Sequence, residues 1–214
     1  MMLKKIKHII WDWNGTLIND AWLFVELMNE ELLIRNLPLI NIEKYRQHFT
    51  FPVKQYYQNL GFDFNKEDFK EVGYNFIQKF SKRRLEPKLF LNTKKILAEI
   101  NQFNISQSII SAQEHQLLNE TIKHYRISHY FNNISGITHY YADSKIQLAE
   151  EERKKINFKD NEIMMIGDSI HDYEVAKKLK IKCVLFSNGH YSKKRLLKTK
   201  NIIIDDLLEL LKYL

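Results

Sequence analysis

Six short apolar runs, separated by helix-like stretches, limit the folds open to this chain more than any other feature. The runs occupy residues 6–11, 105–110, 134–137, 163–166, 181–186 and 202–204. Between the later runs, apolar residues recur at the three- and four-residue spacing of amphipathic helices. Strands that alternate with helices are typical of a parallel sheet covered by helices on both faces. The sequence therefore predicts an α/β fold with a doubly wound parallel sheet.

Residues 20–84 follow a different pattern. Their apolar residues recur at helical spacing, most clearly in residues 21–37 and 65–83, and no segment among them is typical of a strand. The three prolines, Pro38, Pro52 and Pro87, all fall in or next to this region. We therefore expect an all-α insertion after the first strand of the sheet.

Composition excludes several classes of protein. Apolar residues make up 44% of the chain, which is enough for a buried core and excludes extensive disorder. The single cysteine, Cys183, rules out an intrachain disulfide and favours a reducing, cytoplasmic location. No apolar run approaches the roughly 20 residues that span a bilayer. Asp12 interrupts the N-terminal apolar stretch too early for a signal peptide, so we expect no membrane partner.

The chain is basic, with a net charge of +7 from 33 Lys and Arg against 26 Asp and Glu. Such a charge can indicate nucleic-acid binding. Most of these lysines, however, alternate with apolar residues at helical spacing or flank predicted strands. We therefore expect a solvated, lysine-rich surface that suits small anionic substrates, and not a nucleic-acid partner.

Acidic and hydroxyl side chains follow the predicted strands. Asp12 follows the first run and Ser111 the second, while Asp168 follows the fourth and Asp172 lies four residues further on. Ligands of parallel sheets bind outside the carboxyl ends of the strands. Carboxylates gathered there repel one another unless a cation lies between them, and oxygen ligands favour Mg²⁺. Lys145, before the fourth run, could then hold an anion such as phosphate.

Each of these residues also has a purely structural interpretation. Asn14-Gly15 is a strong turn signal, Ser111 with Glu114 fits a capping box, and the Gly-Asp-Ser segment could cap the next helix. A lysine in the first helical turn, as expected for Lys145, costs roughly 0.3–1 kcal/mol, a conflict that a nearby anion would remove. The occurrence of all these residues in this order at strand ends favours a functional site. No glycine-rich GxGxxG turn follows any run, which excludes a nucleotide-cofactor domain.

Together these motifs resemble a known family. DWNGTL, a strand-terminal serine, a lysine and GDSIHD are similar to the four motifs of the haloacid dehalogenase (HAD) superfamily. The run HDYEVAKKLKIKCVLFSNGH is similar to the tail of its phosphoglycolate-phosphatase-like members. The resemblance covers essentially the whole chain. It implies a HAD-type, Rossmann-like core of residues 1–18 and 86–214, with a type 1 helical cap domain of residues 19–85.

The resemblance also implies an activity, the hydrolysis of a small phosphorylated metabolite, such as phosphoglycolate, by a Mg²⁺-dependent phosphatase. Asp12 would be the nucleophile that takes the phosphoryl group as an aspartyl phosphate. The implied ligands of Mg²⁺ are Asp12, the backbone carbonyl of Asn14, Asp168 and Asp172. Carbon–phosphorus cleavage is another chemistry of the superfamily. It would require a lysine in the cap that forms a Schiff base, and Lys54 is the candidate.

Further residues are implied in substrate binding. Ser111 and Lys145 would hold the transferring phosphoryl oxygens, with the backbone N–H of Ala112 as a further donor. Thr16 would brace the loop at the substrate. The cap segment HFTFPVKQYY resembles the loop that faces the active site, although a glycine often found there is missing. Its candidate substrate contacts are His48, Thr50, Lys54 and Tyr57.

Asn14 departs from the family pattern. Phosphatases of the superfamily usually carry Asp at this position as general acid and base, and an amide cannot exchange a proton in that way. Such help is typically worth about 10²–10⁴ in rate. Three alternatives follow. The protein could be a phosphatase whose acyl, anhydride or aryl leaving group needs no proton or receives one from the cap. It could be a catalytically weak or inactive protein that binds Mg²⁺ and a phosphorylated ligand or partner, or Asn14 could be an engineered replacement of Asp.

Overall fold

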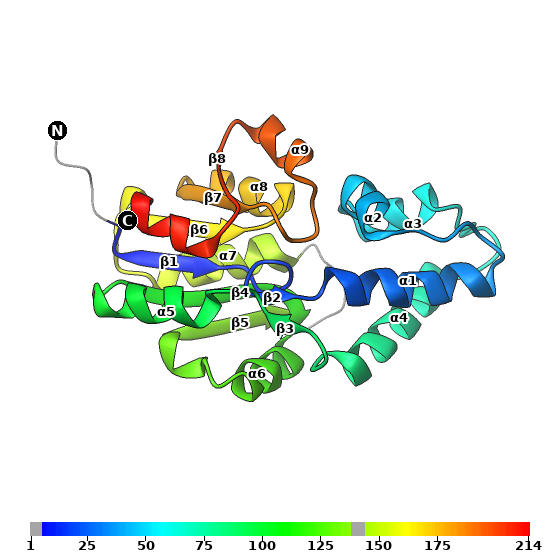
Figure 1. The fold of residues 1–214 in the computed structure, drawn as a ribbon, viewed down its shortest axis with the longest axis horizontal. Coiled ribbons are helices and arrows are strands. Elements are labelled where there is room, and N and C mark those ends of the chain that lie inside the picture. The colour runs from blue at the N-terminus through cyan, green and yellow to red at the C-terminus, as the bar shows by residue number, and fades with distance from the viewer. Residues whose placement is uncertain (1–5, 138–143) are drawn as a thin grey trace.

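A six-stranded parallel sheet forms the centre of the computed structural model, which describes residues 6–137 and 144–214 (Figure 1). The strand order is β5-β4-β1-β6-β7-β8, and every neighbouring pair is parallel. The strands are β1 (His8–Trp11), β4 (Ser106–Glu114), β5 (Asn133–Ile137), β6 (Ile163–Gly167), β7 (Lys182–Phe186) and β8 (Ile202–Ile204). All six apolar runs therefore enter the sheet, and the predicted α/β fold is confirmed.

Helices cover both faces of this sheet. One face packs against α5 (Thr93–Gln102), α6 (His115–His124) and the 3₁₀ helix η4 (Leu207–Tyr213). The other packs against α7 (Ser144–Lys155), α8 (Ile170–Leu179) and α9 (Lys193–Leu196). The remaining short 3₁₀ helices are η1 (Ser128–Tyr130), η2 (Asp160–Glu162) and η3 (Leu197–Thr199).

The pleat of the central strand explains why all four of its residues are buried. Ile9 and Trp11 lie in the apolar cluster with α5 and α6, whereas Ile10 lies in the cluster with α7 and α8. Successive side chains of a strand point to opposite faces, and here both faces are covered, so every position is buried.

Between β1 and β4 the chain forms four helices. They are α1 (Ala21–Ile34), α2 (Ile42–His48), α3 (Val53–Asn59) and α4 (Phe69–Arg83). Residues 20–84 are all described, and none of them forms a strand. The helices share an apolar cluster of their own, which includes Leu27, Tyr56 and Phe76. They lie beyond the carboxyl ends of the sheet strands (Figure 1).

The chain crosses between these two regions at a small antiparallel pair. β2 (Ile18–Asn19) leads into α1, and β3 (Lys88–Leu89) follows α4. These two-residue strands bring the outgoing and returning segments side by side, next to the end of β1. The helical region is thereby held at the edge of the sheet where the candidate residues emerge.

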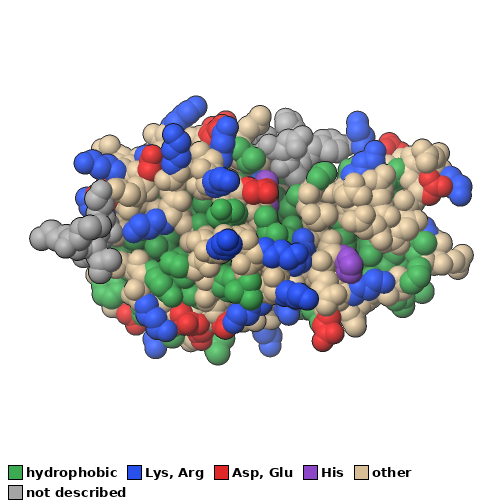
Figure 2. All heavy atoms as spheres, turned by 90° about the horizontal axis from the view of Figure 1, so that it is seen from above, with side chains coloured by type: hydrophobic (Ala, Val, Ile, Leu, Met, Phe, Trp, Pro, Cys, Tyr) green, Lys and Arg blue, Asp and Glu red, His purple; other side chains and the backbone are tan. Residues whose placement is uncertain are grey.

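Lys and Arg side chains are spread over the face shown in Figure 2, among apolar, acidic and neutral ones. In the described parts of the chain, every helix is too short or too polar to cross a lipid bilayer.

Candidate active site

Three buried carboxylates meet at the carboxyl edge of the sheet. Asp12 follows β1 and Asp168 follows β6, and these strands are neighbours in which Trp11 pairs with Ile166. Asp172 lies in the first turn of α8. One carboxylate oxygen from each residue lies within 4.8 Å of those of the other two. The strand ends therefore bring together the acidic residues that the sequence predicts to share a site.

Lys145 lies against this acidic cluster. Its Nζ donates to Asp12 Oδ1 at 2.5 Å and to Asp172 Oδ1 at 2.6 Å. The lysine is buried in the first turn of α7, where the helix dipole disfavours a cation. Burial alone would lower the pKa of Lys145, but the two carboxylates raise it above its usual value. The negative charge that offsets the unfavourable helix dipole at Lys145 thus comes from two protein carboxylates, those of Asp12 and Asp172.

The cluster carries more negative charge than this one lysine balances. Burial raises the pKa of Asp12 to about 6 in spite of Lys145. Burial and the neighbouring charges of Asp12 and Asp172 raise the pKa of Asp168 to about 8. Burial would also raise the pKa of Asp172, but Lys145 and Ser169 hold it below its usual value. A set of buried oxygen donors with excess negative charge fits a hard divalent cation such as Mg²⁺.

Asp172 has a structural role as well. Ser169 is the N-cap of α8, and its Oγ accepts from the backbone N of Asp172 at 3.2 Å. Asp172 Oδ2 accepts in return from the backbone N of Ser169 at 3.0 Å, which completes a capping box. The capping interpretation of this segment is therefore correct and compatible with a functional one, because the other oxygen of Asp172 faces Lys145.

The corresponding interpretation of Ser111 with Glu114 is wrong. β4 continues to Glu114 with a register shift after Ser111, so the serine lies within the strand and cannot cap α6. Glu114 itself is the N-cap and accepts from the backbone N of Gln116 and Leu117 at 3.0 and 2.9 Å. Ser111 is instead left to donate to Asn14 Oδ1 at 3.2 Å.

The side chain of Asn14 is held at both ends of its amide. Nδ2 donates to Asp20 Oδ2 at 2.6 Å, while Oδ1 accepts from Ser111. Asp20 also accepts from the backbone N of Gly15 at 3.0 Å. Asp20 occupies the N-cap position of α1, but its side chain makes no capping bond and faces the Asn14 loop instead. Its carboxylate thus fixes the loop that carries the candidate nucleophile, Asp12.

His190, after β7, links Asp20 to the inserted helices. Its Nε2 lies 3.1 Å from Asp20 Oδ1, and its Nδ1 lies 2.7 Å from the hydroxyl of Tyr45 on α2. Its backbone N donates to Asp168 Oδ2 at 2.5 Å. Burial alone would lower the pKa of His190, but the carboxylates of Asp20 and Asp168 raise it above its usual value. One buried residue therefore contacts the acidic cluster, the Asn14 loop and the helical region.

Two glycines allow this close packing. Gly15 has φ of +76°, and a Cβ at that position would collide with His190 and Asp168. A Cβ at Gly189 would collide with Asp168 and with the carbonyl of Gly15. The backbone can approach the Asp168 carboxylate only where side chains are absent.

Thr16 lies beneath the acidic cluster. Its hydroxyl donates to Asp12 Oδ2 at 2.9 Å and lies 3.4 Å from Asp168 Oδ1. The side chain is fully buried and, in the described residues, is not part of the cavity lining. The structure thus places Thr16 where it braces the carboxylates, and its contribution to substrate binding remains a prediction.

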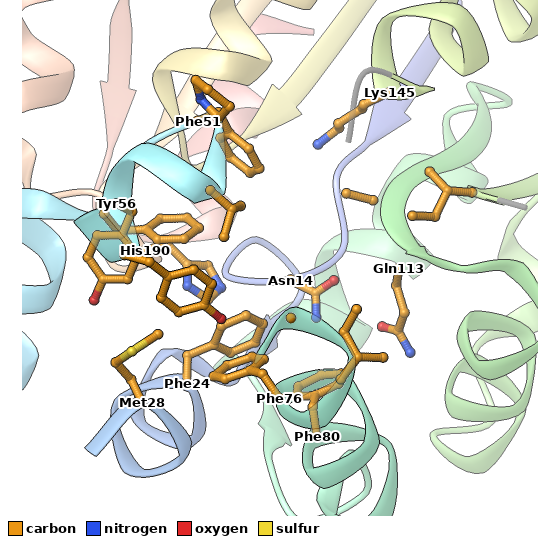
Figure 3. Close-up of a pocket in the computed structure, with 18 of the residues that line it drawn as sticks. Asn14, Phe24, Met28, Phe51, Tyr56, Phe76, Phe80, Gln113, Lys145 and His190 are labelled. Carbon is orange, nitrogen blue, oxygen red and sulfur yellow. The ribbon is translucent and has the colours of Figure 1, made fainter. Parts of the chain in front are cut away.

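A cavity of about 430 Å³ separates the acidic cluster from the four inserted helices (Figure 3). The core residues that line it include Asp12, Asn14, Ala112, Lys145, Asp168 and Asp172. Of the four candidate contacts in the cap segment, Lys54 and Tyr57 line the cavity, whereas His48 and Thr50 are outside its described lining. Lys54 is exposed, with its Nζ 5.8 Å from the ring centroid of Phe64.

Four residues at this site are not predicted from the sequence. They are Asp20, Tyr45, Gln113 and His190. His190 follows a predicted strand, so the rule that led to Asp12 and Asp168 also applies to it. Gln113 lies two residues beyond Ser111 on the same strand. Asp20 and Tyr45 carry no local signal, because their partners lie far away in the sequence.

Comparison with known proteins places this geometry in a family. The model of the haloacid dehalogenase-like hydrolases matches residues 9–186. The chain belongs to this family. The matched range contains the acidic cluster, Lys145 and all four inserted helices. No curated protein sequence matches the chain.

Solved structures of HAD-like proteins share the fold over nearly the whole length. A hydrolase of the haloacid dehalogenase-like family from Streptococcus pneumoniae is 19% identical, with a TM-score of 0.83 over 97% of this chain and 98% of that one. A predicted phosphoglycolate phosphatase from Haemophilus somnus is 18% identical, with a TM-score of 0.78 over 99% of each chain. At these identities the likeness establishes the HAD fold, and the substrate must be argued from the site.

Proposed function

We propose that this protein is a Mg²⁺-dependent phosphoric monoester hydrolase that cleaves a small phosphorylated substrate through an aspartyl phosphate on Asp12. The observation that carries the proposal is the contact of Asp12 with Lys145 inside a trio of buried carboxylates, at the base of a cavity. In this proposal residues 1–18 and 86–214 form the catalytic core. Residues 19–85 form the cap domain that closes over the substrate, and the enzyme acts in the cytoplasm.

The oxygen donors of the site would hold the metal. They are the carboxylate of Asp12, the backbone carbonyl of Asn14, and the carboxylates of Asp168 and Asp172. Bound Mg²⁺ neutralises negative charge on the phosphoryl group, which otherwise repels an anionic nucleophile. Thr16 and Lys145 hold the carboxylate of Asp12 in place through hydrogen bonds to its two oxygens.

The chemistry consists of two displacements at phosphorus. A carboxylate oxygen of Asp12 attacks the phosphorus atom, and the bond to the leaving-group oxygen breaks with its electron pair on that oxygen. Lys145, Ser111 and the backbone N–H of Ala112 bind the phosphoryl oxygens during this transfer. Water then attacks the phosphorus of the aspartyl phosphate, the bond from phosphorus to the Asp12 oxygen breaks with its electron pair on that carboxylate, and the proton of water leaves on the released inorganic phosphate.

Asn14 limits the substrates that this site can process. Its amide is held between Asp20 and Ser111, and an amide cannot deliver a proton to a leaving group. The leaving oxygen must therefore depart as a stable anion or receive its proton from elsewhere. This favours a substrate with a good leaving group over an ordinary alkyl phosphate.

The test is a Mg²⁺-dependent assay with p-nitrophenyl phosphate and acetyl phosphate on the parent chain and on Asp12→Asn. We expect turnover and an acid-stable phosphoenzyme in the parent, and neither in the variant. The exposed Asp63→Asn variant serves as the matched control and should retain both. Turnover by Asp12→Asn comparable with the parent would contradict the covalent route.

The immobilised Asn14 also supports a second candidate. A catalytically weak or inactive HAD-like protein could use the same residues to bind Mg²⁺ and a phosphorylated ligand or partner. No turnover of either substrate, together with Mg²⁺-dependent thermal stabilisation by a phosphate mimic such as beryllofluoride, would favour this binding function over the enzyme.

A further inference from the structure

We propose that the substrate is a small phosphate monoester of an aromatic alcohol, with its ring in the cavity beneath the inserted helices and a polar ring substituent bound by Gln113. The inference rests on the proposed phosphatase function and narrows it. Four observations carry it: the apolar wall of the cavity, the pairing and exposure of its cations, the amide at position 14, and one buried amide that has no hydrogen-bond partner among the described residues.

The wall that the inserted helices present to the cavity is aromatic. Figure 3 shows Phe24, Phe51, Tyr56, Phe76 and Phe80 around the space that faces Asn14. These side chains come from α1, α3, α4 and the segment before α3, so one apolar surface is assembled from the whole helical region. A volume of about 430 Å³ lies in the range of pockets that enclose organic ligands of several rings or substituents. Such a wall stabilises an aromatic ring by apolar burial and ring contacts.

The cations that line the cavity are either held by carboxylates of the protein, as Lys145 and His190 are, or lie at exposed positions. In the described part of the chain the lining includes no arginine. Its three lysines are Lys145, which is bound to two carboxylates, and Lys54 and Lys70, which are both exposed. A carboxylate on a small substrate such as phosphoglycolate would be desolvated against aromatic rings, which is costly. The cavity therefore favours a substrate whose alcohol part carries no charged group besides the phosphate.

The chemistry at Asn14 selects the same class of substrate. A phenol has a pKa near 10, against about 15.7 for water as a guide to simple alcohols. A phenolate can thus leave with the electron pair of the broken phosphorus–oxygen bond and take its proton from water afterwards. The amide of Asn14 cannot supply that proton, and an aryl ester does not require it.

Gln113 indicates a specific polar contact. Its side chain is 9% exposed, and neither Oε1 nor Nε2 has a hydrogen-bond partner among residues 6–137 and 144–214. Figure 3 shows it on the core side of the cavity, opposite Phe24 and His190. A buried amide without partners costs free energy unless a ligand satisfies it. The structure thus assigns Gln113 to a hydrogen-bonding substituent on the ring of the substrate.

A panel of four phosphates tests the class of substrate: 2-naphthyl phosphate, acetyl phosphate, phosphoglycolate and a phosphotyrosyl peptide, each with Mg²⁺. Acetyl phosphate has a better leaving group than 2-naphthyl phosphate but no aromatic ring. It therefore separates the effect of the leaving group from recognition of the ring. We expect kcat/KM for 2-naphthyl phosphate to exceed that for acetyl phosphate by about tenfold and that for phosphoglycolate by about 100-fold.

The outcomes of this panel are distinct. Equal or better cleavage of acetyl phosphate or phosphoglycolate overturns the aromatic assignment while leaving the phosphatase function intact. Preference for the phosphotyrosyl peptide overturns the assignment to a small ester. The absence of Mg²⁺-dependent release from all four substrates overturns the proposed function itself.

Gln113→Leu tests the amide. The apolar replacement removes both polar atoms without leaving an unpaired group, so we expect the variant to fold. We expect its KM for 4-acetylphenyl phosphate to rise about tenfold, with little change for phenyl phosphate and for kcat on either. Gln116→Leu, at an exposed position on α6, is the matched control and should leave all constants unchanged. Equal effects of Gln113→Leu on the two substrates would overturn the role of Gln113.

Discussion

Asn14 donates a hydrogen bond from Nδ2 to Oδ2 of Asp20 at 2.6 Å, so the position where related phosphatases carry a general acid is in direct contact with a buried carboxylate. The relationship explains how an amide is accommodated there. Asp20 accepts from Asn14, from the backbone N of Gly15 and from His190, and each of these partners is a donor. An acid at position 14 would have to share a proton with Asp20.

Asn14→Asp is expected to increase turnover of alkyl phosphates by about tenfold or more, because general acid help typically contributes 10²–10⁴. The new carboxyl would lie against Asp20, and two carboxylates in contact hold one proton between them near neutral pH. Mg²⁺ affinity should change little, since the residue would contribute only its backbone carbonyl. Steady-state kinetics with glycerol phosphate and a Mg²⁺ titration measure both effects.

The control for this change is the double variant Asn14→Asp with Asp20→Asn, which exchanges the acid and the amide. In the double variant no second carboxylate lies beside the new acid, so the pKa of that acid is lower than in the single variant. Its activity should therefore require a lower pH. Unchanged activity of Asn14→Asp on alkyl phosphates would show that another group already supplies the proton.

Removal of metal is expected to make stability depend on pH through Asp168. This carboxyl has a pKa of about 8 in the folded state and 3.8 as its ordinary value, so the folded protein binds the extra proton. The contribution of Asp168 to stability in EDTA is therefore fully present at low pH and is lost as pH rises towards 8. Mg²⁺ should remove this slope, because a ligand to the metal is ionised already. Urea unfolding between about pH 5.5 and 8, with EDTA or Mg²⁺, tests this.

Asp168→Asn separates this effect from other titrations. The variant should be more stable than the parent in EDTA at about pH 8, should have a flatter pH profile, and should gain little from Mg²⁺. An identical slope in the parent and in Asp168→Asn would assign the pH dependence to other groups.

Acid sensitivity is expected from His8 on β1. Its ring lies 2.7 Å from Ser106 Oγ and 2.9 Å from Ser108 Oγ, and burial, with a smaller contribution from Arg153, lowers its pKa to about 4. Below about pH 6.5 the unfolded chain binds a proton at His8, whereas the folded protein does not bind it until about pH 4. The free energy of unfolding therefore falls as pH drops from 6.5 towards 4, by at most about 3 kcal/mol.

His8→Asn keeps polar atoms at this position and removes the titration. As pH falls from about 7 to 4.5, the free energy of unfolding should therefore decrease more in the parent than in the variant. His124→Asn, at an exposed position on α6, is the matched control. A difference between parent and His8→Asn that does not vary with pH would refute this account.

Closure of the helical region over the site is expected to depend on Arg46. Its Nε donates to the carbonyl of Gly189 at 2.8 Å and its Nη2 to that of Asn188 at 2.6 Å, which joins α2 to the loop that carries His190. Loss of both hydrogen bonds in Arg46→Ala should raise KM by about tenfold with a smaller effect on kcat.

The matched control for Arg46 is Arg83→Ala. Arg83 makes its ion pairs with Glu26 and Glu86, away from the cavity. Comparable KM values for the parent and Arg46→Ala would show that these hydrogen bonds do not contribute to closure.

Much of the site was predictable because it follows from the sheet. β1 and β6 are buried on both faces, so their sequences are predominantly apolar, and the residue after each of these strands lies at the carboxyl edge of the sheet. Asp12 and Asp168 could therefore be placed together without knowledge of any contact. The extension of β4 to Glu114 was not predictable, because it depends on pairing with β5 rather than on the apolar pattern.

The sequence by itself determined the parallel α/β fold, the helical insertion and the acidic cluster, because the burial of strands and the periodicity of helices leave patterns that are local in the chain. Only the tertiary structure decided that Asp20 faces Asn14 instead of capping α1, and that His190 bonds to Tyr45, 145 residues away. The Gln113 amide, which has no hydrogen-bond partner among residues 6–137 and 144–214, and the aromatic wall depend in the same way on how helices and strands pack. Such contacts arise from packing between distant elements, for which no short segment of sequence carries a signal.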